Sequence, residues 1–79
     1  MKLYLISQTV NNCYDTYDSA VVRANTPDEA RMIHPGGSPW DGKGREYGLW
    51  CNSKDVNVEC IGESKHKIIG VVLTSFNAG

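Results

Sequence analysis

The first residues alternate in the way that is typical of a β-strand. Residues 2–8 place Leu3 and Leu5 on one side of an extended segment, and Tyr4 and Ile6 on the other side. Because both sides carry large apolar groups, we expect a strand that needs cover on both faces.

A second strand is predicted over residues 19–25. The preceding residues 9–18 are rich in Asn, Asp and Tyr, which favours a wide connection or a distorted hairpin tip. Within the second strand, small residues alternate with Val21 and Arg23, so one face has room for close packing. The face with this room carries Ala20, Val22 and Ala24.

The start of a helix is the clearest local signal. Thr26 can cap free backbone N–H groups, Pro27 occupies the first helical position, and Glu29 can complete a capping box. Residues 35–37, Pro-Gly-Gly, end the helix after two to three turns. Its inner stripe carries Ala30 and Ile33.

The second half of the chain predicts a loop followed by strands. Residues 36–48 are rich in glycine and form a long loop, residues 49–52 a short strand, and residues 53–55 a turn. Residues 56–62 alternate as a further strand, and the uniformly apolar residues 67–76 predict a central strand covered on both faces. The side chains expected to point inward from the alternating strand are Val56, Val58 and Cys60.

This order of elements predicts an α+β fold in one domain, residues 1–79. We expect a four- to five-stranded antiparallel sheet with one short helix packed on one face, in the order ββαβββ, because no βαβ alternation favours a parallel sheet. One short helix cannot cover both sheet faces, so the second face is a candidate surface for a partner or a homodimer. The residues expected on it are Tyr4, Ile6 and Val21, together with some of Ile69, Val71 and Leu73.

Composition narrows the function classes. The 79 residues are 41% hydrophobic and 22% charged, which is typical of a folded domain but too short for most enzyme architectures. The formal net charge of −1 gives no field to attract nucleic acid or an anionic membrane. Three cysteines at unequal spacing favour a reducing cytoplasm over a disulfide framework, and no segment is long enough to span a membrane.

Catalytic and metal chemistry find little support. Zinc ligands usually come in pairs two to four residues apart, whereas Cys51 and Cys60 are far apart and would need His66 with Cys13 or His34. The same thiols and histidines could form a nucleophile and base, but no nucleophile elbow or phosphate loop is present. We therefore expect no enzyme activity, no metal and no cofactor.

Nucleic-acid binding is a weaker alternative. An aromatic and basic loop could stack bases and contact phosphates, although Asp41 and Glu46 lie inside it. Its residues are Trp40, Lys43, Arg45, Tyr47 and Trp50. Conversely, Asp15, Asp18, Asp28 and Glu29 could mimic DNA phosphates, but they are few in a near-neutral chain.

Protein binding is the function class that the residues favour. Tyr14, Asp15, Tyr17 and Asp18 form an aromatic and acidic loop, while the loop at 40–47 is aromatic and basic. Tyrosine, tryptophan and arginine dominate the energetics of interfaces. The candidate partner-binding residues are Tyr14, Asp15, Tyr17, Asp18, Trp40, Lys43, Arg45 and Tyr47.

Four segments resemble small phage and prophage proteins: MKLYLISQ, YDTYDSAVV, TPDEARMIHP and VVLTSFNAG. The resemblance covers most of the chain except residues 36–47, and proteins of this size and layout include anti-CRISPR proteins. It implies an inhibitor in the bacterial cytoplasm that binds a CRISPR–Cas effector complex and blocks DNA recognition or nuclease recruitment. Two alternatives stay open: a self-associating phage accessory or regulatory domain, and a small domain that binds nucleic acid directly.

Overall fold

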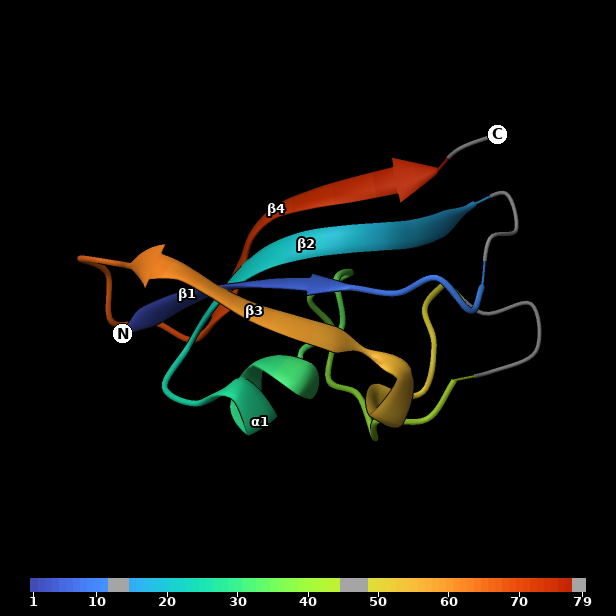
Figure 1. The fold of residues 1–79 in the computed structure, drawn as a ribbon, viewed down its shortest axis with the longest axis horizontal. Coiled ribbons are helices and arrows are strands. Elements are labelled where there is room, and N and C mark those ends of the chain that lie inside the picture. Colours follow the sequence, from blue (N-terminus) through green and yellow to red (C-terminus); the bar gives the residue numbers. More distant parts are fainter. Residues whose placement is uncertain (12–14, 45–48, 78–79) are drawn as a thin grey trace.

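A computed structural model describes residues 1–11, 15–44 and 49–77. Four strands form one antiparallel sheet, with one short α-helix and one 3₁₀ helix beside it (Figure 1). The predicted α+β class, with a four-stranded antiparallel sheet and one short helix, is confirmed. The elements are β1 Lys2–Ser7, β2 Thr16–Ala24, α1 Pro27–Arg31, η1 Ser53–Asp55, β3 Asn57–Glu63 and β4 Gly70–Asn77.

The strand order is β3-β1-β2-β4, so the N-terminal hairpin forms the centre and the two later strands form the edges. The register pairs Tyr4 with Val22 and with Cys60, and it pairs Val22 with Val71. Each edge strand carries one unpaired bulge residue, Ile61 in β3 and Val72 in β4, where its register shifts against its neighbour.

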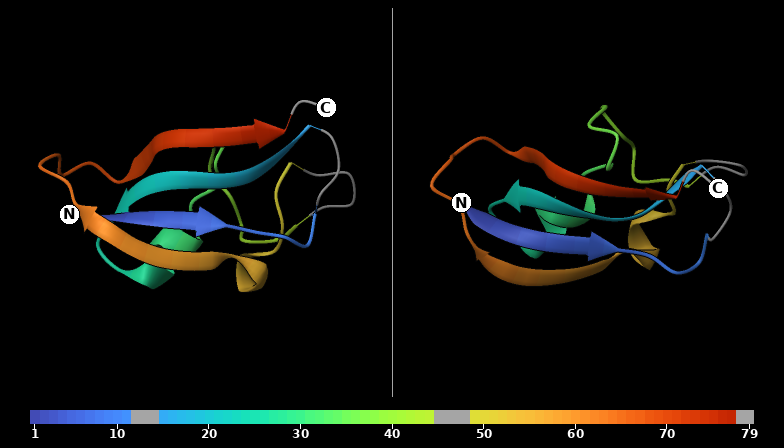
Figure 2. Two further views of the ribbon diagram at one scale, coloured as in Figure 1. Left: turned by 45° about the horizontal axis from the view of Figure 1, so that its top comes forward. Right: turned by 90° about the horizontal axis from the view of Figure 1, so that it is seen from above.

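The core lies on the face that α1 covers, which we call the inner face. Tyr4 and Ile6 are buried there, because they pair across the hairpin with Val22 and Ala20. The expectation that Tyr4 and Ile6 lie on the second face was therefore wrong. The outer face carries Leu3, Leu5, Val21 and Leu73, and no described helix or loop crosses it (Figure 2).

The predicted helix start is confirmed, but the helix is shorter than expected. Thr26 Oγ1 accepts a hydrogen bond from the Glu29 N–H at 3.1 Å, and Glu29 Oε1 accepts one from the Asn25 N–H at 2.9 Å. Only residues 27–31 are helical, followed by a Met32 cap. Ala30 is fully buried, and a helix of this length is stabilised mainly by such packing.

The segment after α1 supplies the rest of the inner layer. Arg31 Nη1 donates to the carbonyl oxygens of Ser53 at 3.2 Å and Val56 at 2.5 Å, which ties α1 to η1. Trp50 and Cys51 are buried in the core. The strand expected at 49–52 was wrong, since these residues pack by side chains rather than by pairing, and the turn expected at 53–55 is η1.

The last strand is the largest departure from the prediction. Residues 67–76 were expected to be central and covered, but β4 pairs only with β2 and is an edge of the sheet. β1 and β2 occupy the centre because they pair with each other over residues 2–7 and 19–24, which leaves β4 the free edge of β2 and β3 the free edge of β1. Edge position also explains Cys60, which was expected to point into the core and is exposed on β3.

Candidate protein-binding surface

Four rings form a row on the inner face. The ring centroids of Trp40 and His34 lie 5.6 Å apart, those of His34 and Tyr17 6.1 Å, and those of Tyr17 and Phe76 4.8 Å. The first two contacts are edge-to-face, the arrangement that ring quadrupoles favour. We call these four residues the aromatic row.

Partly buried hydrogen bonds at the start of β2 position Tyr17. The Gln8 side chain donates to the carbonyl oxygens of Asn11 at 2.7 Å and Tyr17 at 3.0 Å, and it accepts from the Asn11 N–H at 2.7 Å. The Tyr17 N–H donates to the Leu49 carbonyl oxygen at 2.9 Å. The register shift between Tyr17 and Ser19 then turns the Tyr17 ring onto the inner face, where it packs against the core.

His34 and Trp40, the two members of the row that lie outside the sheet, are positioned by local turns. His34 Nδ1 accepts a hydrogen bond from the Gly36 N–H at 2.9 Å, and the His34 carbonyl oxygen accepts one from the Gly37 N–H at 2.9 Å. Trp40 Nε1 donates to the Lys43 carbonyl oxygen at 3.0 Å. Hydrogen bonds within its own turn therefore hold each of these two residues, in addition to the contact between their rings.

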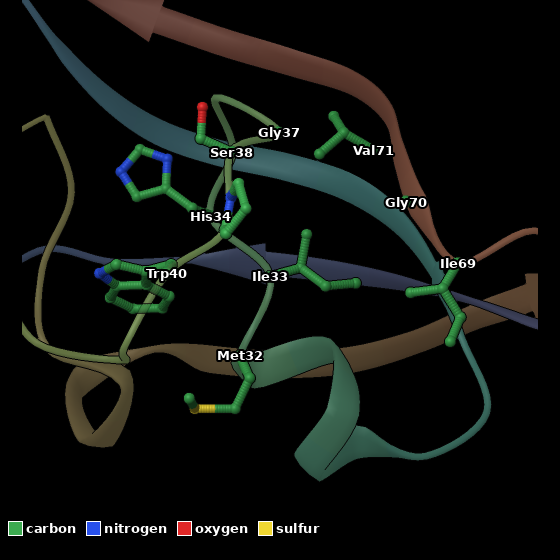
Figure 3. Close-up of a pocket in the computed structure, with 10 residues that line it drawn as sticks. Met32, Ile33, His34, Gly37, Ser38, Trp40, Ile69, Gly70 and Val71 are labelled. Atoms are coloured by element: carbon green, nitrogen blue, oxygen red, sulfur yellow. The ribbon is translucent and has the colours of Figure 1, made fainter.

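A groove of about 300 Å³ opens between the segment 32–40 and the start of β4 (Figure 3). Met32 and Ile69 reach its rim and are 45% and 47% exposed. Its main side chains are Met32, Ile33, His34, Trp40, Ile69 and Val71, and we call it the aromatic groove. Apolar side chains around a half-open hollow are typical of surfaces that bind an anchor residue of a partner.

The groove presents little charge at neutral pH. Burial lowers the pKa of His34, which favours the neutral imidazole. The hydrogen bond from the Gly36 N–H to Nδ1 also requires that this nitrogen carry no proton.

At the β4 end of the groove, Arg23 Nε donates to the Ile68 carbonyl oxygen at 2.8 Å, which holds the chain that leads into β4.

The structure separates the predicted partner-binding residues. Tyr17 and Trp40 come together through His34 in the aromatic row. Asp15 and Asp18 are exposed outside it, and Lys43 is exposed in the turn that holds Trp40. Tyr14, Arg45 and Tyr47 lie outside the described residues.

The sequence reading missed His34 and Phe76 as members of the surface. The prediction that residues 35–37 end the helix placed His34 within the helix, and the prediction of a covered strand over residues 67–76 placed Phe76 inside that strand. The one available signal was the turn at 35–37, where the Gly36 N–H donates to His34 Nδ1 and the His34 ring faces Tyr17.

Other chemistry at the described residues is limited. Cys51 is only 4% exposed; burial, with a smaller contribution from Asp55, raises the pKa of its thiol to about 11. Trp50 is buried and cannot stack on a base, which removes it from the proposed nucleic-acid loop. Residues 1–11, 15–44 and 49–77 hold no group of three or more His, Cys, Asp or Glu side chains that could bind a metal.

No helix among the described residues is long and apolar enough to cross a membrane. Comparisons of the chain with protein-family models, with curated proteins and with solved structures find no match.

Proposed function

We propose that the protein is a non-catalytic binding domain that recognises a protein partner through the aromatic groove. The observation that carries this proposal is the exposure of Met32 and Ile69 at the rim of a groove that is also lined by His34 and Trp40 of the aromatic row. Exposed apolar side chains beside fixed aromatic rings supply contact area without a large loss of conformational entropy on binding.

The partner that we propose is a CRISPR–Cas effector complex of the bacterial host. The resemblance of the segments MKLYLISQ, YDTYDSAVV, TPDEARMIHP and VVLTSFNAG to small phage proteins supports this choice. The protein then inhibits by occupying the surface that recognises DNA or recruits the nuclease. Such an inhibitor acts in the bacterial cytoplasm and needs no cofactor.

The states of Cys51 and His34 in the inner layer favour a binding role over catalysis. A nucleophilic cysteine needs a thiolate, and a pKa of about 11 keeps the Cys51 thiol protonated near neutral pH. His34 uses Nδ1 to accept from the Gly36 N–H, so this nitrogen is engaged in the turn.

The experiment measures DNA binding and DNA cleavage by purified effector complexes of several types with increasing amounts of the protein. We expect inhibition by the wild type and at least a tenfold loss with Met32→Glu, because a partner would bury the added charge. Ile61→Glu is the matched control: its side chain is about as exposed, but it lies on β3 at the other edge of the sheet.

Two outcomes overturn the proposal. Unchanged DNA binding and cleavage by every effector complex refutes the partner, and equal inhibition by Met32→Glu and the wild type refutes the groove. A parallel titration of the protein with DNA and RNA at low salt tests the nucleic-acid alternative. Binding that weakens steeply with added salt would favour that alternative over protein recognition.

A further inference from the structure

The two edges of the sheet differ in charge. The β3 edge carries exposed Glu59 and Glu63, which discourage pairing with another strand. By contrast, residues 68–77 contain no charged residue and no proline, and many of them are β-branched. Exposed Val72 and Leu73, at 48% and 66%, make β4 an edge that is open to a further strand.

Charged side chains do lie beyond both ends of β4, with opposite signs. Exposed Lys65 and Lys67 precede the strand, and Arg23 pairs with Gly70 at its start. Exposed Asp15 and Asp18 lie next to its other end, where Thr16 pairs with Asn77. The described charges therefore make the start of β4 positive and its end negative.

We propose that β4 pairs antiparallel with β4 of a second copy of this chain, about a two-fold axis close to Leu73. This arrangement sets the positive start of each strand beside the negative end of the other, whereas a parallel arrangement sets like charges together. The strand itself needs no complementary charge because residues 68–77 have none. A self-complementary patch of this kind is what a two-fold interface requires.

The outer face supports the same pairing. Leu5 pairs with Val21 and Val21 pairs with Leu73, so a short apolar stripe runs across the sheet and ends at the β4 edge. An axis near Leu73 continues this stripe into the second copy and covers the most exposed apolar residue of β4. Both inner faces then lie on one side of a continuous sheet.

An interface of one strand per copy is small. Interfaces below about 1,200 Å² are typical of weak association, so we expect a dimer with a Kd in the micromolar range. Sedimentation velocity from about 5 to 500 µM should show a monomer that converts to a dimer as concentration rises.

Two matched variants test the edge. Val72→Lys places a charge at the bulge of β4, and Ile61→Lys places one at the bulge of β3, where the native side chain is 49% exposed. We expect Val72→Lys to weaken the dimer at least tenfold and Ile61→Lys to leave it unchanged. Circular dichroism of both variants checks that they fold.

A crosslinking experiment tests the orientation. Leu73→Cys, in a Cys13→Ser and Cys60→Ser background, should form a disulfide-linked dimer, since directly opposite Cα atoms lie about 4.5–5.5 Å apart. Ser75→Cys should not crosslink, because antiparallel pairing separates the two copies of residue 75. Crosslinking of both variants indicates a parallel pair and overturns the proposed orientation.

A monomer over the whole concentration range, or equal dimerisation of Val72→Lys and the wild type, overturns the proposal. In the first case β4 is free for a strand of a different protein.

Discussion

Among the described glycines, Gly44 is the one whose added Cβ would meet backbone atoms at the shortest distance, so its substitution tests how the loop after Trp40 packs against residues 51–52. A Cβ atom at Gly44 would lie 2.8 Å from the Asn52 nitrogen and 3.0 Å from the Cys51 carbonyl carbon. Both are backbone atoms and cannot rotate away. The contact is secured by hydrogen bonds from the Gly44 N–H to Asn52 Oδ1 at 2.6 Å and from the Ser53 N–H to the Gly42 carbonyl oxygen at 2.8 Å.

The expected cost follows from these contacts. Forcing one extra carbon into a packed site costs about 1–3 kcal/mol, and each hydrogen bond that is disturbed adds about 0.5–1.5 kcal/mol. Alanine also lowers the conformational entropy of the unfolded chain, which stabilises the folded protein by about 0.4–1 kcal/mol. We therefore expect Gly44→Ala to lower the free energy of unfolding by about 2–4 kcal/mol.

Substitutions at two other glycines distinguish the free-energy cost of lacking space from the cost of an unfavourable backbone conformation. Gly37 has a φ of 83° but nothing within 4 Å of an added Cβ, so Gly37→Ala should cost about 1 kcal/mol from conformation alone. Gly62 has an ordinary φ and equally open space, so Gly62→Ala should be neutral or stabilising by up to about 1 kcal/mol.

Urea unfolding followed by tryptophan fluorescence measures all three variants. Thermal unfolding provides a second measure, because 1 kcal/mol shifts the Tm of a domain of this size by about 4–8 °C. If Gly44→Ala is no less stable than Gly37→Ala, the close approach of residues 44 and 51–52 is refuted.

Three further results are expected. Iodoacetamide at pH 8 should alkylate the exposed Cys60 well before Cys51, whose burial raises the pKa of its thiol to about 11; peptide mass spectrometry measures both, and equal rates would contradict the buried placement. Burial lowers the pKa of His34 in the folded protein. As the pH falls below the ordinary value of 6.5, the His34 imidazole is therefore protonated in the unfolded chain before it is protonated in the folded protein. The contribution of neutral His34 to the free energy of unfolding is thus present above that pH and lost below it. His34→Gln should therefore reduce the slope of the free energy of unfolding against pH between 7.5 and 5.5, and an unchanged slope would contradict the lowered pKa of His34. Gln8→Leu should cost more than about 2 kcal/mol in urea unfolding, since it removes three hydrogen bonds to partly buried backbone groups, whereas Thr26→Ala at the helix cap should cost only about 1 kcal/mol; the reverse order would refute the role of Gln8.

Local interactions explain what the sequence could predict. The capping of α1 by Thr26 and Glu29 depends on residues within one turn, and the alternation in β1 and β2 depends on neighbours in one strand. These features were identified from spacing alone. The length of α1 was overestimated because the apolar positions continue beyond Arg31, while the chain leaves the helix to let His34 meet Tyr17.

Strand order could not be obtained in the same way. The apolar residues of β4 suit a covered central strand equally well, and only long-range pairing decides that β1 and β2 occupy the centre. The candidate surface shows the same limit. Tyr17 and Trp40 were chosen for their residue types, but their common neighbour His34 follows from packing between segments that are distant in the sequence.

The strand order has a consequence for how the chain acquires its structure. The centre of the sheet, β1 and β2, is synthesised first, and both edges come from the last third of the chain. Closing the sheet therefore requires β3 to return to β1 over a long loop, and contacts of this separation slow folding. Until that closure the hairpin has two open edges, so we expect stable folding only after most of the chain has been synthesised. Truncation after residue 56 should leave a chain without stable tertiary structure, although it retains the entire central hairpin and α1.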